Sequence, residues 1–261
     1  MYLVSIQKNA NYAPKLNSKQ YKNFKMKKIA FILFFSLIAK STFAQFWMEA
    51  GIKGATGATL LYNKNIFDDG TASYKIKTDF AVGPRVAFNF GDHHGVSLEG
   101  LFSQSKAYYA GQIGTQVTAL NYTWQNIDAY AMYRYYYERS FIEIGPKMSF
   151  LNKMEEGLTA KRDVKANFTS QNLGAAFGFG GFLAGNENLS LGFNIRIDYQ
   201  FSDFVNSTGK TGNYPLTFSN YSSYSPTNPI IARVGLDLAF GLGGVAKAQC
   251  GRRVFFFGGG R

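Results

Sequence analysis

Hydrophobic and polar residues alternate strictly in residues 189–201, which read LSLGFNIRIDYQF. Every odd-numbered residue there is Leu, Phe, Ile or Tyr, and every even-numbered one is Ser, Gly, Asn, Arg, Asp or Gln. A period of two is the period of a β-strand, whose successive side chains point to opposite faces. The segment therefore predicts a strand with one apolar face and one polar face, the latter carrying Arg196 and Asp198.

The same alternation recurs along the chain, and no helix-period segment of useful length competes with it. It marks eight segments, at about 46–53, 80–90, 96–103, 127–135, 142–150, 172–183, 189–201 and 230–240. Their connections alternate between long polar loops (61–78, 106–117, 152–170 and 205–227) and short turns (91–94, 136–140 and 184–188). Long loops at one end and tight turns at the other are typical of outer-membrane barrels. We predict an all-β fold, an eight-stranded antiparallel up-and-down transmembrane β-barrel with both termini at the short-turn end.

The apolar face lacks charge in all eight segments, and the other face carries charges in every segment but the sixth. A soluble barrel such as a lipocalin would turn its apolar face inward. In lipid the relation inverts, because a charge facing mid-bilayer costs about 2 to 4 kcal/mol. We therefore expect a side-chain-filled lumen with a network of six basic and six acidic residues: Glu49, Lys53, Arg85, Glu99, Asp128, Arg134, Glu143, Lys147, Arg196, Asp198, Arg233 and Asp237.

The net charge of +12 suggests nucleic-acid binding until it is located along the chain. Residues 1–44 hold eight Lys and no acid, which leaves 20 basic and 16 acidic residues from Gln45 onward. We therefore expect no nucleic-acid partner. Residues 26–44 have the layout of a signal peptide, with a basic start, an apolar run and cleavage after Ala44. The apolar run is too short for a membrane-spanning helix, which needs about 20 residues.

The predicted organisation follows from these segments. Residues 1–25 are interpreted as a non-native upstream extension, with Met26 as the start used in the cell. The barrel is expected at 45–242 and a periplasmic tail at 243–261.

Residues suited to catalysis or metal binding are few. The only histidines, His93 and His94, are adjacent in a short turn, and the single cysteine, Cys250, precludes an intrachain disulfide. Enzymes of the outer membrane need a base beside a nucleophile or an attacking water. We expect no enzyme activity, catalytic residue, cofactor or metal site.

Three motifs carry a resemblance to small outer-membrane β-barrel proteins of the OmpA/OmpX type, and in particular to the PorT-like barrels of Bacteroidetes. These motifs are FAQF at 43–46, FIEIGPKMSF at 141–150 and ARVGLDLAF at 232–240, and the resemblance covers about 45–242. It implies an outer-membrane location and a barrel architecture. Such families include adhesins and factors for assembly or secretion.

Surface binding or adhesion through the long loops is the predicted function, since the fourth loop is rich in Tyr, Ser and Asn. A small channel, or an accessory barrel for assembly or secretion, is the alternative. The expected partners of this monomer are outer-membrane lipid, an extracellular ligand and the outer-membrane assembly machinery. The last strand carries Arg233, Gly235, Leu238 and Phe240, which resemble the signal that this machinery recognises.

Overall fold

A computed structural model describes residues 46–113, 116–157, 160–185, 189–217 and 221–242. Strands dominate it, and the helices are single short turns. The elements are β1 (Phe46–Asn63), α2 (Lys64–Asp68), β2 (Ser73–Lys75), β3 (Lys77–Phe90), β4 (His94–Ile113), β5 (Gln116–Tyr137), β6 (Ser140–Glu156), β7 (Arg162–Asp163), η1 (Lys165–Asn167), β8 (Gln171–Gly185), β9 (Leu189–Gln200), α3 (Ser207–Thr211) and β10 (Thr227–Gly241). No helix among the described residues is long and apolar enough to cross a membrane.

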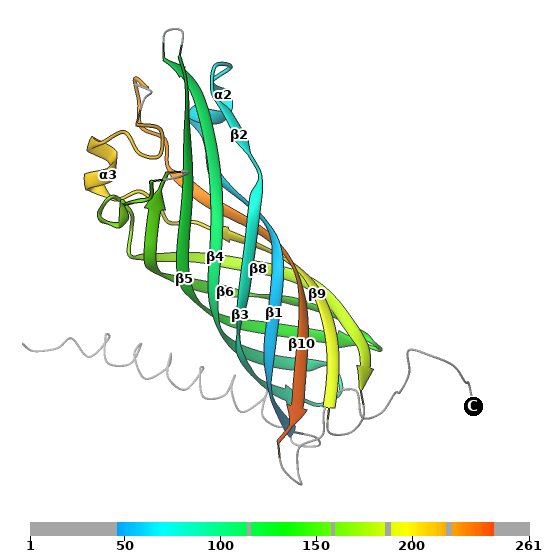
Figure 1. Ribbon diagram of the computed structural model, residues 1–261. Coiled ribbons are helices and arrows are strands. Elements are labelled where there is room, and N and C mark those ends of the chain that lie inside the picture. Colours follow the sequence, from blue (N-terminus) through cyan, green and yellow to red (C-terminus); the bar gives the residue numbers. More distant parts are fainter. Residues whose placement is uncertain (1–45, 114–115, 158–159, 186–188, 218–220, 243–261) are drawn as a thin grey trace, which may run out of the picture. The chain divides into compact units, whose positions relative to one another are not determined.

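Eight strands close into a ring in the order β1, β3, β4, β5, β6, β8, β9 and β10 (Figure 1). Each strand pairs antiparallel with its neighbours, and β10 returns to β1 with Ala55 opposite Gly235. Closure leaves no strand edge without backbone partners, which hydrocarbon demands. The predicted eight-stranded up-and-down barrel is confirmed.

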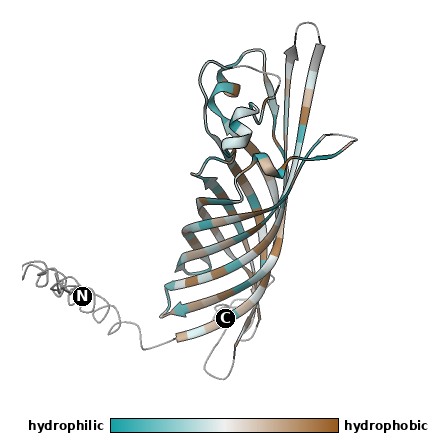
Figure 2. Ribbon diagram, turned by 90° about the vertical axis from the view of Figure 1, so that its left-hand side faces the viewer, coloured by the Kyte–Doolittle hydropathy of each residue, from teal (hydrophilic) through white to brown (hydrophobic). Residues whose placement is uncertain are grey.

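The two faces of each strand differ sharply in exposure, and Figure 2 shows the alternation of hydropathy along the ribbons. On β1, Ile52 is 60% exposed, whereas the next residue, Lys53, is 2% exposed. The outward positions of β9 and β10 are likewise apolar and exposed, for example Ile197 and Val234. The polar face of each strand, which is charged in all of them but β8, therefore points into the lumen, and the apolar face points outward.

Several strands extend beyond the bounds that the sequence predicted, β4 and β5 among them. Residues 106–117 were expected to be a long loop, but β4 continues to Ile113 and pairs with β5 from Gln116. On this extension the polarity of the faces is reversed. Tyr109 and Trp124 face inward and are buried, while Lys106 faces outward and is exposed. The expectation of a loop was wrong because the apolar-out pattern ends where the strands leave the membrane.

The predicted upstream extension (1–25), signal peptide (26–44) and tail (243–261) lie outside the described residues. The strands run from Phe46 to Gly241, within the predicted barrel range of 45–242.

Glycine is required where β1 meets β10 at the closing seam. A Cβ added to Gly51 would lie 2.2 Å from the carbonyl oxygen of Leu238, whereas a Cβ at Gly54 would meet nothing within 4 Å. We expect Gly51→Val to reduce the yield of heat-resistant barrel on refolding in detergent, because overpacking costs about 1 to 3 kcal/mol. Gly54→Val, three residues away on the outer face, is the matched control. Equal yields of the two variants would contradict this account of the seam.

Candidate functional site

The lumen contains two clusters of ion pairs. The lower lumen cluster, nearer the short turns, consists of Lys53, Glu99, Arg134, Glu143, Arg196 and Asp237. Arg196 bridges two carboxylates, with Nη1 2.8 Å from Glu99 and Nε 2.8 Å from Glu143. Arg134 does the same between Glu143 at 2.8 Å and Asp237 at 3.0 Å. Three cations therefore meet three anions, each from a different strand.

The upper lumen cluster, nearer the long loops, consists of Asp79, Asp128, Lys147, Asp198 and Arg233. Lys147 Nζ lies 3.0 Å from Asp198 and 3.3 Å from Asp128. Arg233 binds Asp198 through Nη1 at 3.0 Å and Asp79 through Nη2 at 3.0 Å. Two cations here meet three carboxylates, which also accept hydrogen bonds from neutral hydroxyls such as Ser103 and Ser105.

Tyr130 separates the two clusters and contacts both. Its hydroxyl donates to Asp198 at 2.6 Å and accepts from Arg233 at 2.6 Å. The guanidinium of Arg196 lies 4.9 Å from the centroid of its ring. Removing this side chain would therefore disturb both clusters.

All twelve charged residues predicted for the lumen lie on the inner face, and none is more than 4% exposed. Arg85 and Glu49, which belong to neither cluster, face each other at 3.6 Å near the short turns. Sequence reasoning missed Asp79, which is buried beside Arg233. The alternation contained the signal, because Asp79 is in phase with Arg85. It was missed because Asp79 lies one residue before the predicted start of its strand.

The long loops fold over the open end of the ring around a hydrophobic core, which we call the loop cap. Its buried residues are Leu61, Ile66, Ala107, Tyr109, Tyr122, Trp124, Leu151, Met154, Val164, Phe168, Phe204, Val205, Tyr214 and Leu216. The third and fourth loops were described from the sequence as polar, and the burial of side chains such as Phe168 and Leu216 corrects that description. Excision of residues 206–225 would remove two of these core residues, Tyr214 and Leu216.

Asp203 organises the fourth loop. Its carboxylate accepts hydrogen bonds from the Tyr224 hydroxyl at 2.6 Å and from the backbone N–H groups of Val205 and Thr227 at 3.1 Å each, and Lys210 Nζ lies 2.9 Å away. Partial burial raises the pKa of Asp203, but these hydrogen bonds outweigh it and hold the pKa below its ordinary value. The charged form of Asp203 therefore stabilises the folded loop.

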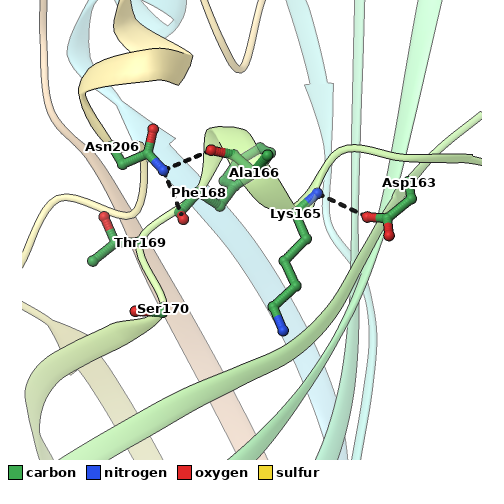
Figure 3. A pocket seen from close by; sticks show the side chains of 7 residues that line it. All are labelled: Asp163, Lys165, Ala166, Phe168, Thr169, Ser170 and Asn206. Atoms are coloured by element: carbon green, nitrogen blue, oxygen red, sulfur yellow. Dashed lines mark hydrogen bonds between the residues drawn. The ribbon is translucent and has the colours of Figure 1, made fainter.

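A groove of about 780 Å³ opens between the third and fourth loops (Figure 3). Asn206 forms part of its wall and donates to the carbonyl oxygens of Ala166 at 2.8 Å and Phe168 at 3.0 Å, which fixes η1. Lys165 and Ser170 also line the groove, and both are exposed. The groove therefore presents an ammonium group, the carboxylate of Asp163 and hydroxyls on an immobilised backbone.

The histidines have structural contacts. His93 Nδ1 lies 3.0 Å from the carbonyl oxygen of Tyr136, and His94 Nδ1 lies 2.7 Å from the hydroxyl of Tyr133. Within the described ranges, no group of three or more His, Cys, Asp or Glu side chains could hold a metal ion.

The four residues of the predicted assembly signal occupy both faces of β10. Arg233 and Gly235 face the lumen, where a Cβ on Gly235 would lie 2.5 Å from Asn194 Oδ1. Leu238 and Phe240 face outward near the short turns. Recognition by the assembly machinery remains a prediction.

Comparison with known proteins gives structural likeness alone, since no family model and no curated protein matches the chain. Neisserial surface protein A is 15% identical, with 74% of this chain and 96% of that chain covered and a TM-score of 0.35. OprG from Pseudomonas aeruginosa is 14% identical (75% and 95% covered, TM-score 0.37), and Ail of Yersinia pestis is 12% identical (74% and 98%, TM-score 0.34). At these values the likeness decides nothing about function.

The physical arrangement itself gives the location. A closed ring with an apolar outer face and buried charges suits a bilayer, and closed barrels of this kind are the architecture of the bacterial outer membrane. The chain is an integral outer-membrane β-barrel. In such barrels the short turns are periplasmic and the long loops are extracellular.

Loss of one partner in the lumen should destabilise the barrel strongly. Arg196→Leu leaves Glu99 and Glu143 buried with fewer cations, and removal of one partner from a buried pair costs about 3 to 5 kcal/mol. The control is Lys153→Leu, whose ammonium binds Glu155 at 2.8 Å but is half-exposed, so the expected cost is about 0 to 1 kcal/mol. Urea unfolding in detergent measures both. Similar costs for the two variants would refute a buried network.

The fourth loop should loosen in acid. Because the folded pKa of Asp203 is lowered, its contribution is fully present above the ordinary value of about 4 and is lost as the pH falls through the lower, folded value. The protection of the Val205 and Thr227 amides against hydrogen exchange, relative to their intrinsic exchange rate at each pH, should therefore fall only below about pH 4. In Asp203→Asn these amides should be less protected at neutral pH, with little change on acidification. The same acid dependence in that variant would exclude Asp203 as the cause.

Proposed function

We propose that this outer-membrane barrel does not conduct and binds a ligand at the cell surface through its loop cap. The observation that carries the proposal is the hydrophobic core of the cap, which joins the first, third and fourth loops and the upper parts of β4 and β5 into one folded surface. A surface that is ordered before binding loses less conformational entropy when a ligand arrives. A loop that served only to stay in water would need no such core.

Contacts between loops support this assignment. Asn63 donates to the Ser225 carbonyl oxygen at 2.8 Å, Tyr221 donates to Asp69 at 2.9 Å, and Arg162 donates to Tyr214 at 3.2 Å. The first, third and fourth loops are therefore tied together. The groove beside Lys165 lies on this assembled surface and is its best candidate for the point of contact.

A channel is disfavoured by the packing of the lumen. Water in a conducting pore would reach the charges that line it, yet the inward charges of both clusters are buried. Eight strands also give an interior about wide enough for side chains to fill. We expect the barrel to be non-enzymatic, because no residue in the groove pairs a nucleophile with a base.

The resemblance to PorT-like barrels of Bacteroidetes rests on the three sequence motifs and remains part of the proposal. On that reading the alternative role is an accessory barrel for assembly or secretion, with periplasmic rather than extracellular partners.

Conductance and adhesion test the proposal separately. Planar-bilayer recordings of the intact protein should show no steady porin-like open state, and such a state would favour the channel. For adhesion, cells that display the barrel should bind to wells coated with fibronectin or mucin.

A double variant that blocks the groove, Lys165→Ala with Ser170→Trp, should lose most of this binding. Lys64→Ala, on the exposed surface of α2, is the control and should retain it. The surface-binding function would be overturned if the groove variant bound as well as the wild type. It would also be overturned if cells that display the wild-type barrel bound no better than cells without it.

A further inference from the structure

Three lysines gather around the outward-facing ring of Tyr108. Lys77 pairs with the buried Thr59, in phase with Asp79, so only its ammonium group reaches this ring. Lys75 Nζ lies 5.0 Å and Lys77 Nζ lies 5.1 Å from the ring centroid of Tyr108. Lys106 is two residues before Tyr108 on β4, so its exposed side chain leaves from the same outer face. We call Lys75, Lys77, Lys106 and Tyr108 the outer lysine patch.

The positive charge of the patch is not neutralised by the protein. None of its three lysines forms an ion pair with another residue of the described chain. By contrast, Lys153 on β6 and Lys161 just before β7 share Glu155 at 2.8 and 3.5 Å. The ammonium groups of Lys75 and Lys77 are at most about 10 Å apart, because both lie near one ring. An anion between them would relieve their repulsion.

The patch lies at the level of lipid headgroups. Along β4 the outward apolar residues begin at Val96 near the short turns, and Lys106 is ten residues further on. At about 3.4 Å per residue and a tilt of about 35 to 45°, this distance rises roughly 24 to 28 Å along the membrane normal. The apolar band of such barrels is about 25 Å tall. Lys106 therefore marks its upper edge.

Apolar side chains continue below and beside the patch. Phe80 and Phe102 are exposed on β3 and β4 toward the membrane, and Ile76, between two of the lysines, is 65% exposed. A molecule with an anionic head and acyl chains would satisfy both surfaces at once. A phosphomonoester carries close to two negative charges and three acceptor oxygens, which matches several ammonium donors.

We propose that the outer lysine patch binds the phosphate of a lipid in the outer leaflet, with the acyl chains lying along Phe80 and Phe102. This goes beyond ligand binding by the loop cap and needs only the membrane location. Failure of the cell-adhesion experiment therefore leaves the lipid site intact, and failure of the lipid-binding experiment leaves ligand binding by the loop cap intact.

The test uses the full-length barrel in phosphatidylcholine vesicles with or without phosphatidic acid, followed by detergent extraction and native mass spectrometry. The wild type should retain phosphatidic acid in preference to phosphatidylcholine. The variant Lys75→Gln/Lys77→Gln/Lys106→Gln should retain on the order of tenfold less, since each basic residue near the surface contributes to attraction of anionic lipid. Lys153→Gln/Lys161→Gln, which removes paired lysines, should behave as the wild type does. Heat modifiability checks the folding of each variant, and Lys106→Gln alone provides a milder change.

Three results would overturn the proposal. They are equal retention by the patch variant and the wild type, an equal loss in the Lys153/Lys161 control, and no preference for phosphatidic acid in the wild type. Inorganic phosphate, added to the barrel in detergent, distinguishes a lipid from a free anion. Stabilisation against heat by phosphate alone, equal to that by phosphatidic acid, would contradict a lipid site.

Discussion

The exclusion of charge from hydrocarbon is the constraint on which the rest of this structure depends. It sends one face of each strand inward, and because the side-chain period is two, a slip of one residue would turn every charge of that strand toward lipid. Lys53 and Ile52 are neighbours in the chain but occupy opposite environments. Ion pairing inside the ring then fixes how the strands face each other, as where Arg134 of β5 meets Asp237 of β10.

The filled lumen also explains why the proposed ligand-binding surface lies above the ring. Inside the membrane the interior is polar, but above it the same inner face becomes apolar, with Tyr109 and Trp124 buried under the loops. The upper barrel is therefore built like a soluble protein and the lower barrel like a membrane protein. The loop cap can fold because the strands beneath it are held by the two lumen clusters.

The fold could be predicted from sequence wherever this constraint acts. Alternation found all eight strands, and it placed Arg196 and Asp198 on the inner face. It did not find the extension of β4 and β5, because beyond the bilayer no lipid contacts the outer face and that face need not be apolar. The loop cap was also missed, since the packing of Phe168 against Phe204, with ring centroids 5.2 Å apart, joins segments that no local pattern connects. The outer lysine patch depends on the pairing of β2 with β4, which is equally non-local.

The orientation of the strand faces is the central claim, and accessibility along β9 tests it most directly. Single cysteines at residues 194–199, in a background with Cys250→Ser, would carry nitroxide spin labels in lipid vesicles. Our account predicts high accessibility to oxygen, which partitions into lipid, at Ile195, Ile197 and Tyr199. At Asn194, Arg196 and Asp198 it predicts low accessibility both to oxygen and to a water-soluble nickel complex. Oxygen accessibility without a period of two, or with the opposite phase, would contradict it.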